Sequence, residues 1–303
     1  MNDPNFIIGG AAASGTSFLS EILIQHPNIF LPKNMRPEPH FFYKSWEFKK
    51  GIKYYRTKWF SDSDLNHIAI GERSSSYLFG SKQVAEKIHA FYPNMRFIFI
   101  LRNPIERVWA NYRYTVLEGL ETNSFQAALL TEKKRIKKQK GIWSEIQPFN
   151  YTGRSFYAKQ IKEFLKIFSN KNILLIKSEK LSLNTDVELK KICNFLNVSD
   201  NFKYKLAPLH TSLSVVDRYL QKNLRQYFKN DFDVIVEIIR KKENLKTFPN
   251  YTKHLKKIKS LSNNLEKKKI KMPQSCRNFL RYIFENDIQE LKSLVDFDVN
   301  DWI

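Results

Sequence analysis

A loop of small residues near the N-terminus, Gly9 to Ser17, has the composition of a phosphate-binding loop. It follows a short apolar run, Phe6 to Ile8, and precedes apolar residues at helical spacing. At such a strand-to-helix loop, free backbone N–H groups and the positive end of the helix dipole meet at one point. Gly15 allows close backbone approach, and Thr16 and Ser17 add hydroxyl donors. The loop therefore predicts a phosphorylated ligand.

The glycine spacing of this loop separates it from an ordinary ATPase or kinase. Gly10 and Gly15 match the pattern Gly-x-x-x-x-Gly-Lys-Ser/Thr, but Thr16 stands in the lysine position. A P-loop kinase is therefore disfavoured. Small residues also occur where a helix packs tightly on a strand, and this remains the alternative interpretation of the loop.

A second group with chemical potential is Arg102, which follows the apolar run Met95 to Leu101 and precedes Asn103 and Pro104. A guanidinium at the end of a strand can hold a phosphate through paired hydrogen bonds. The alternative is a turn that only caps a helix.

The elements that must position these groups alternate between strands and helices, which predicts a parallel sheet. Continuous apolar runs predict buried strands at residues 6–8, 95–101 and 172–176. Helical periodicity and proline positions predict helices at residues 81–92, 104–118, 155–168 and 186–196. We predict a single α/β domain over 1–303, P-loop-like, with a central parallel sheet flanked by helices. Its parts are a core at about 5–200, a helical elaboration in the C-terminal third at about 201–271, and a C-terminal helix and tail at 272–303.

The charge of the chain favours an anionic partner. Fifty-one Lys and Arg against thirty Asp and Glu give a formal net charge of +21, which suits phosphate, sulfate, nucleic acid or acidic glycan. Many lysines fall on predicted polar helix faces with no interleaved aromatic groove, so nucleic acid is not expected. A lysine-rich composition without any polyanion ligand is the equal alternative.

Cysteine, histidine and hydropathy patterns exclude several other classes. Cys193 and Cys276 each lie in an apolar helical context, which predicts no disulfide and no cysteine metal site. The six histidines show no ligand spacing, so no metal is expected. The first strand begins at Phe6, which leaves no room for a signal peptide, and no apolar run approaches the ~18 residues of a membrane span. These features predict a cytoplasmic protein without a membrane span.

Two motifs carry a resemblance to sulfotransferases that use PAPS, 3′-phosphoadenosine 5′-phosphosulfate. The stretch Phe6-Ile-Ile-Gly-Gly-Ala-Ala-Ala-Ser-Gly-Thr-Ser-Phe-Leu19 resembles their 5′-phosphosulfate loop, Gly-x-Pro-Lys/Arg-Ser-Gly-Thr-Thr. Leu101-Arg-Asn-Pro-Ile-Glu-Arg-Val-Trp-Ala-Asn-Tyr112 is similar to their 3′-phosphate motif of Arg-Asn/Asp-Pro, then Arg, then Ser and an aromatic. The resemblance implies PAPS as co-substrate, bound by Gly10, Ala11, Ala12, Ala13, Ser14, Gly15, Thr16, Ser17, Arg102, Ala110, Arg154 and Tyr157.

A third segment, Arg36-Pro-Glu-Pro-His-Phe-Phe42, is similar to the family's Lys-Glu-x-His-Phe-Phe. The resemblance implies that Glu38 is the base that removes the acceptor proton, with His40 as the second choice. From the residues alone, Glu38 could equally be a solvated carboxylate and His40 a packed ring.

Further matches cover most of the chain and are weakest at about 213–270. Gly71-Glu-Arg-Ser-Ser-Ser-Tyr77 is similar to Gly-Glu-Lys-Ser/Thr-Pro-x-Tyr, which places Arg73 at a family lysine. Arg73, with Arg36, is a candidate to neutralise the sulfuryl group. Arg154-Ser-Phe-Tyr157 is similar to the family's Arg-Gly-x-Tyr.

Two departures fall inside the motifs. Ala13 replaces the loop lysine or arginine that bridges the 5′-phosphate and the sulfuryl group, and Ala110 replaces the 3′-phosphate serine. Loss of a charged donor where negative charge develops costs on the order of 3 kcal/mol of transition-state stabilisation.

The resemblance implies transfer of a sulfuryl group from PAPS to an acceptor hydroxyl, with a saccharide favoured over a small hydroxylated molecule. The alternative is a catalytically impaired or non-catalytic protein of the same fold that binds nucleotide or polyanion, which Ala13 and Ala110 favour. The sequence does not specify the oligomeric state.

Overall fold

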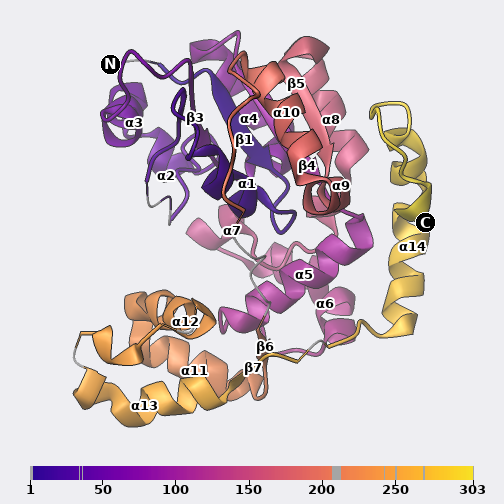
Figure 1. Cartoon of the computed structure of the whole chain (residues 1–303). Helices are drawn as coiled ribbons and strands as arrows, with labels where there is room; N and C mark the ends of the chain where they lie inside the picture. The colour runs from indigo at the N-terminus through magenta and orange to yellow at the C-terminus, as the bar shows by residue number, and fades with distance from the viewer. Residues whose placement is uncertain are drawn as a thin grey trace.

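A five-stranded parallel sheet forms the centre of the protein, with strand order β2-β3-β1-β4-β5 (Figure 1). The strands are β1 (Phe6–Gly10), β2 (Ile29–Phe30), β3 (Ala69–Arg73), β4 (Arg96–Leu101) and β5 (Ile173–Lys177). This computed structural model describes residues 3–33, 35, 37–206, 213–241, 243–249, 251–268 and 270–302. Ile8 of β1 lies opposite Arg73 of β3 and Ile98 of β4, so the carboxyl ends of the three central strands meet at one edge.

Both faces of the sheet are buried, which explains why β1, β4 and β5 are continuous apolar runs in the sequence. Alternate residues enter two different hydrophobic clusters: Ile7 and Phe97 face one side, and Ile8 and Ile98 face the other. Strand β3 breaks this pattern because its last residues are polar and still fully buried.

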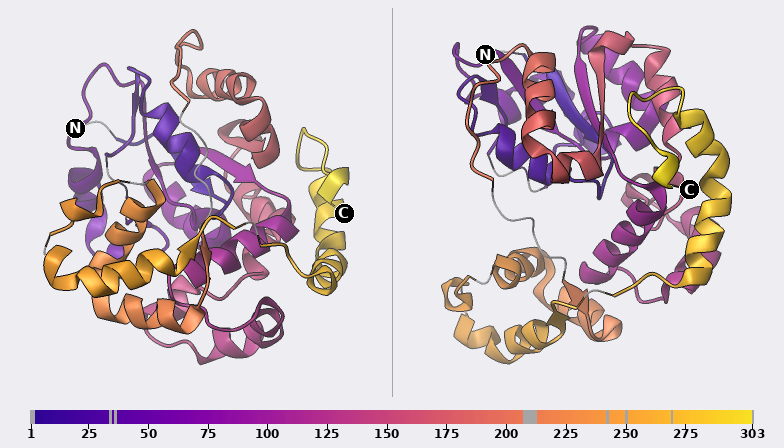
Figure 2. Two further views of the ribbon diagram at one scale, coloured as in Figure 1. Left: turned by 60° about the horizontal axis from the view of Figure 1, so that its bottom comes forward. Right: turned by 45° about the vertical axis from the view of Figure 1, so that its right-hand side comes forward.

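Helices form a layer on each face of the sheet (Figures 1 and 2). One face is covered by α1 (Thr16–Leu23), α9 (Ser178–Leu183) and α10 (Thr185–Leu196). The other is covered by α3 (Gly51–Phe60), α4 (Tyr77–Phe91), α5 (Pro104–Leu117), α8 (Tyr157–Leu165) and α14 (Gln274–Leu291). Shorter or peripheral elements are α2 (Ser45–Phe48), α6 (Phe125–Lys138), α7 (Ile142–Ile146) and the 3₁₀ turns Gly153–Ser155, Asn170–Asn172, Lys229–Asp231, Leu245–Thr247 and Asn300–Trp302.

The predicted fold class is confirmed, and individual elements differ from prediction where tertiary contacts decide. The predicted helices at 104–118 and 186–196 agree with α5 and α10 within one residue at each end. The helix predicted from Ser81 begins earlier, at Tyr77, and Ser81 forms a kink inside it at φ 51° and ψ −131°. The helix predicted at 155–168 is shorter, because a 3₁₀ turn ending at Ser155 precedes α8.

The C-terminal third contains a helical lobe with its own small core (Figures 1 and 2). It consists of α11 (Arg218–Phe228), α12 (Phe232–Lys241), α13 (Tyr251–Asn263) and the antiparallel pair β6 (Ser214–Val215) and β7 (Leu265–Glu266). Phe228, Phe232 and Ile258 pack in its centre. The Gln221 side chain joins the lobe to the rest of the protein by donating to the Leu117 carbonyl of α5 at 2.7 Å.

Two sequence-level features have simple structural counterparts. Cys193 and Cys276 are both buried free thiols. None of the helices in the described part of the chain is long and apolar enough to span a membrane.

Candidate functional site

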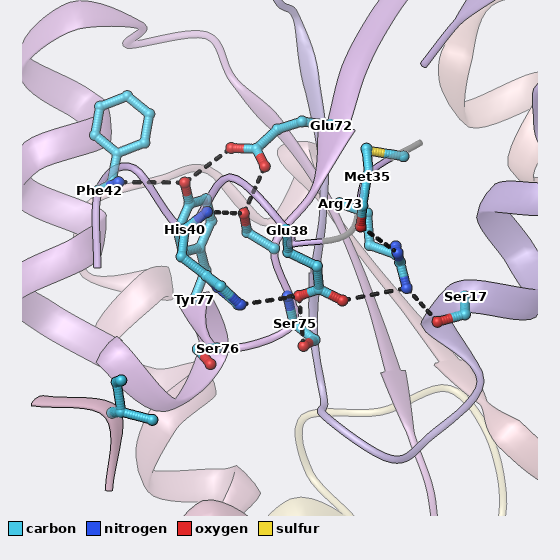
Figure 3. Close-up of polar contacts among 12 residues, drawn as sticks. Ser17, Met35, Glu38, His40, Phe42, Glu72, Arg73, Ser75, Ser76 and Tyr77 are labelled. Atoms are coloured by element: carbon cyan, nitrogen blue, oxygen red, sulfur yellow. Dashed lines mark hydrogen bonds and ion pairs between the residues drawn. The ribbon is translucent and has the colours of Figure 1, made fainter. Parts of the chain in front are cut away.

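The predicted site residues converge on the carboxyl edge of the sheet, where parallel α/β sheets bind ligands. The loop after β1 and the turn after β3 meet there, and Arg102 follows β4 at the same edge. The segment 37–42 between β2 and α2 lies against the turn after β3 (Figure 3).

The loop after β1 is tightly fitted to the start of α4 and leaves the N-terminus of α1 open. A Cβ at Gly10 would lie 2.9 Å from the Cβ of Leu78, so only glycine allows this approach. Gly15 precedes α1 with φ 103°, a left-handed conformation that glycine adopts without strain. The first N–H groups of α1 have no partner within the helix and point toward the loop. The geometry suits an anion at this point.

Two arginines from the α5 region contact the loop through its carbonyl groups. Arg102 donates to the Ala13 carbonyl at 3.3 Å, and Arg107 donates to the Ala12 carbonyl at 3.3 Å. Arg107 is fully buried and also donates to the Tyr151 carbonyl at 2.6 Å. Burial lowers the pKa of Arg107 to about 10, which leaves it charged at neutral pH. Among the described residues Arg107 forms no ion pair with a carboxylate, and its guanidinium donates to neutral oxygens of Ala12, Asn111, Tyr151 and Ser155.

Two buried hydroxyls beside the loop, the Ser14 Oγ and the Tyr157 Oη, make no hydrogen bond of ordinary geometry to the described residues, although they lie near each other and near the Arg102 backbone. Burial raises the pKa of Tyr157 to about 12, while Arg107, Ser14 and the backbone of Arg102 act in the opposite direction. These four residues therefore lie close together. Buried donors without partners are uncommon in proteins, and here they are placed to bind a phosphate.

Glu38 is the carboxylate at the centre of the acceptor side of the site. Its Oε2 accepts hydrogen bonds from the Ser75 N–H at 2.8 Å and the Ser75 hydroxyl at 2.7 Å. His40 Nε2 lies 3.1 Å from the same oxygen, and Arg73 lies 3.1 Å from Oε1. Burial by itself raises the pKa of Glu38. The hydrogen bond from His40, the charge of Arg73 and the Ser75 N–H outweigh burial and lower that pKa to about 2.

Arg73 connects the two sides of the site. Its guanidinium pairs with Glu38, donates to the Ser17 hydroxyl at the start of α1, and donates to the Met35 carbonyl at 3.0 Å (Figure 3). The side chain is 7% exposed. The candidate base Glu38 and the phosphate loop at Ser17 are thus both bonded to the Arg73 guanidinium. Arg36, the other cation considered for the sulfuryl group, lies outside the described residues.

His40 is held so that its ring supports Glu38. Burial lowers the pKa of His40 below its ordinary value despite the hydrogen bond to Glu38, so the ring is neutral at neutral pH. With Nε2 directed at the carboxylate, the buried Nδ1 has no partner among the described residues.

The sequence motifs did not specify the contacts of Arg154 or the position of Ala110 relative to the loop after β1. Arg154 is buried, donates to the Ile146 carbonyl at 2.6 Å and to the Ser76 hydroxyl at 3.3 Å, and faces the acceptor side. Ala110 lies half-buried on α5, two turns from its first residue. Neither residue contacts the loop after β1 through a hydrogen bond that the structure shows.

Two residues of the site had no role in the sequence interpretation, Arg107 and Ser75. Both stand inside motifs that resemble a family pattern, and this resemblance is the sequence signal that points to them. What the sequence did not provide was the tertiary contact of each, to Ala12 and Glu38 respectively. Within the described ranges, no group of three or more His, Cys, Asp and Glu side chains could hold a metal ion.

Comparison with known proteins gives a consistent set of relatives. The profile of a family described as "Sulfotransferase domain" matches residues 3–207. Heparan sulfate glucosamine 3-O-sulfotransferase 6 from Homo sapiens is 26% identical over 195 residues, which are 64% of this chain and 52% of that protein. Heparan sulfate glucosamine 3-O-sulfotransferase 5 from Mus musculus is 29% identical over 196 residues, 64% of this chain and 54% of that protein. The chain spans about half the length of these curated relatives.

Among solved structures, a sulfotransferase from Alicyclobacillus acidocaldarius aligns with a TM-score of 0.72 at 23% sequence identity. The alignment covers 100% of this chain and 99% of that chain. The two proteins therefore share their fold, and the helical lobe beyond residue 207 lies outside the family match.

Proposed function

Because the chain belongs to the sulfotransferase domain family, we propose that it transfers the sulfuryl group of PAPS to a hydroxyl of a saccharide acceptor. The observation that carries this proposal is the position of Glu38. Its carboxylate is fixed by Ser75 and paired with Arg73, which also reaches Ser17 in the phosphate loop. A proton acceptor and an anion-binding loop are thereby brought together by a single guanidinium.

The residues that would hold PAPS fit a doubly phosphorylated nucleotide. The N-terminus of α1, which has no side-chain cap, and the adjacent buried Ser14 and Tyr157 hydroxyls suit the 5′-phosphosulfate. Arg102 would bind the 3′-phosphate, and Arg113 lies near enough to Arg102 for the two charges to disfavour each other. Such a surplus of positive charge is relieved when an anion binds.

The reaction follows the logic of phosphoryl transfer, in which positioning and charge stabilisation do most of the work. PAPS supplies the activated sulfuryl group. The acceptor oxygen forms a bond to sulfur, the bond from sulfur to the 5′-phosphate oxygen breaks, and adenosine 3′,5′-bisphosphate leaves. Glu38 takes the acceptor proton. Its Oε1 has Arg73 as its partner whereas Oε2 already accepts from Ser75 and His40, so Oε1 is the oxygen with room for that proton.

Arg73 would also control how basic Glu38 is. A carboxylate with a pKa of about 2 is ionised at neutral pH but attracts a proton weakly. If Arg73 moves its charge toward the sulfuryl oxygens as negative charge develops there, the pKa of Glu38 rises. Since Ala13 supplies no side-chain cation in the loop, Arg73, Arg102 and the buried Arg107, which contact Ser17, Ala13 and Ala12, would supply the positive charge near the leaving group.

A saccharide acceptor is supported by the relatives, whose names specify heparan sulfate glucosamine as the group sulfated. The rival proposal is a nucleotide-binding protein without turnover, and Ala13 and Ala110 are the observations that favour it.

The test is transfer of labelled sulfate from PAPS to a panel of saccharides and small alcohols, with binding of adenosine 3′,5′-bisphosphate measured in parallel by calorimetry. Glu38→Gln should lower kcat by about 10³-fold while nucleotide affinity is kept. Arg102→Ala should weaken nucleotide binding. Glu86→Gln and Arg281→Ala, at exposed positions on α4 and α14, are the matched controls.

The outcomes separate the proposals. Nucleotide binding without transfer to any acceptor supports the rival. Full transfer by Glu38→Gln would remove Glu38 from the role of base, and ATP binding as tightly as the bisphosphate would contradict the assignment of PAPS.

A further inference from the structure

A buried carboxylate outside the proposed reacting groups, Glu72, is connected to the loop that carries Glu38 and His40. We infer that Glu72 is a positioning residue, which fixes this loop by orienting the hydroxyls of Ser74 and Tyr77 toward itself. The inference rests on the proposed function, because it assigns Glu38 and His40 to the acceptor side of that site.

Glu72 is fully buried at the end of β3, and among the described residues it has no cationic partner. Three hydroxyls donate to it instead: Tyr55 and Tyr77 to Oε1 at 2.8 Å each, and Ser74 to Oε2 at 2.5 Å. A buried carboxylate is stable only when its lone pairs are satisfied in this way.

Two of these hydroxyls also accept a hydrogen bond from the loop, which creates two parallel relays. Ser74 Oγ accepts from the backbone N–H of His40 at 2.7 Å. Tyr77 Oη accepts from the backbone N–H of Phe42 at 3.2 Å (Figure 3). Each relay therefore runs from Glu72 through one hydroxyl to one N–H group of the loop.

The direction of each relay depends on Glu72 being ionised, so that both of its oxygens accept; because its pKa is raised to about 7, this form prevails above neutral pH. A hydroxyl has one proton and two lone pairs, so a hydroxyl that donates to Glu72 must turn lone pairs toward the loop N–H. An amide at position 72 would face one of the two hydroxyls donor to donor and leave that hydroxyl proton without an acceptor. The loop would then lose one of its two fixed points.

The loop needs such support because His40 has φ 46°, a left-handed conformation that a non-glycine residue adopts at some cost. Its N–H is held by Ser74, and its side chain reaches back to Glu38. If this conformation relaxes, the imidazole moves away from Glu38 and the carboxylate loses one of its fixed partners.

Tyr55 provides a matched control inside the same network. It is as buried as Tyr77 and donates to the same oxygen of Glu72 at the same distance. Its ring packs on Phe41 and Phe42, but its hydroxyl forms no hydrogen bond to the described part of the loop. Tyr55→Phe and Tyr77→Phe therefore remove an equal bond to Glu72, and Tyr77→Phe alone also removes a bond to the loop.

The experiment measures kcat, KM for PAPS and adenosine 3′,5′-bisphosphate affinity for Tyr55→Phe, Tyr77→Phe, Ser74→Ala, Ser74→Thr and Glu72→Gln in the full chain. Loss of a fixed point that misplaces the base should lower kcat by about 10²-fold in Tyr77→Phe, Ser74→Ala and Glu72→Gln. KM for PAPS and nucleotide affinity should stay within about twofold, because the phosphate loop is untouched. Ser74→Thr, which keeps the hydroxyl, should restore most of the rate, and Tyr55→Phe should keep it.

A second readout does not require turnover. The NMR titration of His40, assigned with a His40→Gln variant, should show its imidazole pKa moving up toward the ordinary value in Tyr77→Phe and Ser74→Ala. Burial is the largest cause of the lowered pKa, so the solvent that a released ring gains outweighs its loss of Glu38. The pKa should stay low in Tyr55→Phe. Equal loss of rate in the two tyrosine variants, or an unchanged His40 titration in Ser74→Ala, overturns the inference. A wild-type protein that transfers no sulfate contradicts the proposed function instead, and the titration still tests the relays.

Discussion

The nucleotide side and the acceptor side of the sheet edge are built in opposite ways. Beside the loop after β1, the Ser14 and Tyr157 hydroxyls make no hydrogen bond of ordinary geometry to the described residues, and the cations around the loop come from other elements. On the acceptor side, Glu38 has a partner for each carboxylate oxygen. Glu72 is satisfied by three hydroxyls.

This difference indicates which property each side controls. Hydrogen-bond donors that lack a protein partner contribute to nucleotide affinity, because the bound ligand satisfies them. The Glu38 and Glu72 carboxylates are satisfied without ligand, although His40 Nδ1 and Arg73 Nε have no partner among the described residues. Carboxylates held in this way are preorganised, so the loss of their partners lowers turnover more than affinity. Substitutions on the two sides should therefore separate in their kinetic effects.

Arg107→Met should have the largest effect and is the strongest test of the nucleotide side. Four acceptors lose their donor: the Ala12 and Tyr151 carbonyls, the Ser155 hydroxyl and the Asn111 amide oxygen. At about 1 kcal/mol for each bond, the free energy of unfolding should fall by about 4 kcal/mol. Chemical denaturation measures this.

The control for Arg107→Met is Arg281→Met, which removes an exposed guanidinium from α14. A stable Arg107→Met variant with unchanged bisphosphate affinity would show that the buried arginine supports neither the loop nor the ligand, and the contrast between the two sides would fail.

Glu72→Gln should change how stability depends on pH. Burial and the charge of Glu38 raise the pKa of Glu72 to about 7, against the hydrogen bonds of Ser74, Tyr77 and Tyr55. Below pH 4.5 the carboxyl is protonated in both the folded and the unfolded chain. Between pH 4.5 and 7 the unfolded carboxyl ionises first, so the contribution of Glu72 to stability falls by about 3 kcal/mol and then levels off.

The measurement is the free energy of unfolding of wild type and Glu72→Gln from pH 4.5 to 8. As pH rises, the free energy of unfolding of the wild type should fall relative to that of Glu72→Gln. Glu38, whose pKa is lowered, gives the opposite trend below pH 4.5 and is present in both proteins. A difference independent of pH would mean that Glu72 ionises normally in the folded protein.

The contrast between the two sides also shows what the sequence could specify. Strands β1, β4 and β5 were predictable because burial on both faces makes them apolar runs. Strand β3 could not be predicted from an apolar run, because it ends in the polar residues Glu72 and Arg73. These are buried and are satisfied by contacts with distant segments. The family resemblance is confirmed by the match over residues 3–207.

Within the site, motif similarity was enough to propose Glu38 and Arg73, but not the arrangement around them. The bond from the His40 N–H to Ser74 joins residues 34 apart in sequence, and that from Arg107 to Ala12 joins residues 95 apart. No local pattern encodes such pairs. The roles of the individual site residues stay predictions that the variants above test.

Ala13→Lys should sharpen the description of the nucleotide side by adding the cation that the loop lacks. A charged donor where negative charge develops is worth about 10²-fold in kcat, so we expect a gain of that order in sulfate transfer. Ala13→Met, of similar length and uncharged, should give no gain. If Ala13→Lys also gives none, Arg73 already supplies the charge and the loop is complete without a lysine.

Ala110→Ser should have the smallest effect and tests how α5 faces the nucleotide. A hydroxyl directed at the 3′-phosphate adds one hydrogen bond to a charged group, which should tighten binding of adenosine 3′,5′-bisphosphate about fivefold in calorimetry. Adenosine 5′-monophosphate lacks the 3′-phosphate and should bind equally to both proteins. A gain for both nucleotides would place the new hydroxyl near the 5′ end. A gain for neither would mean that this part of α5, beginning two turns after Pro104, does not border the 3′-phosphate, and Arg102 would then have to hold that phosphate without help from position 110.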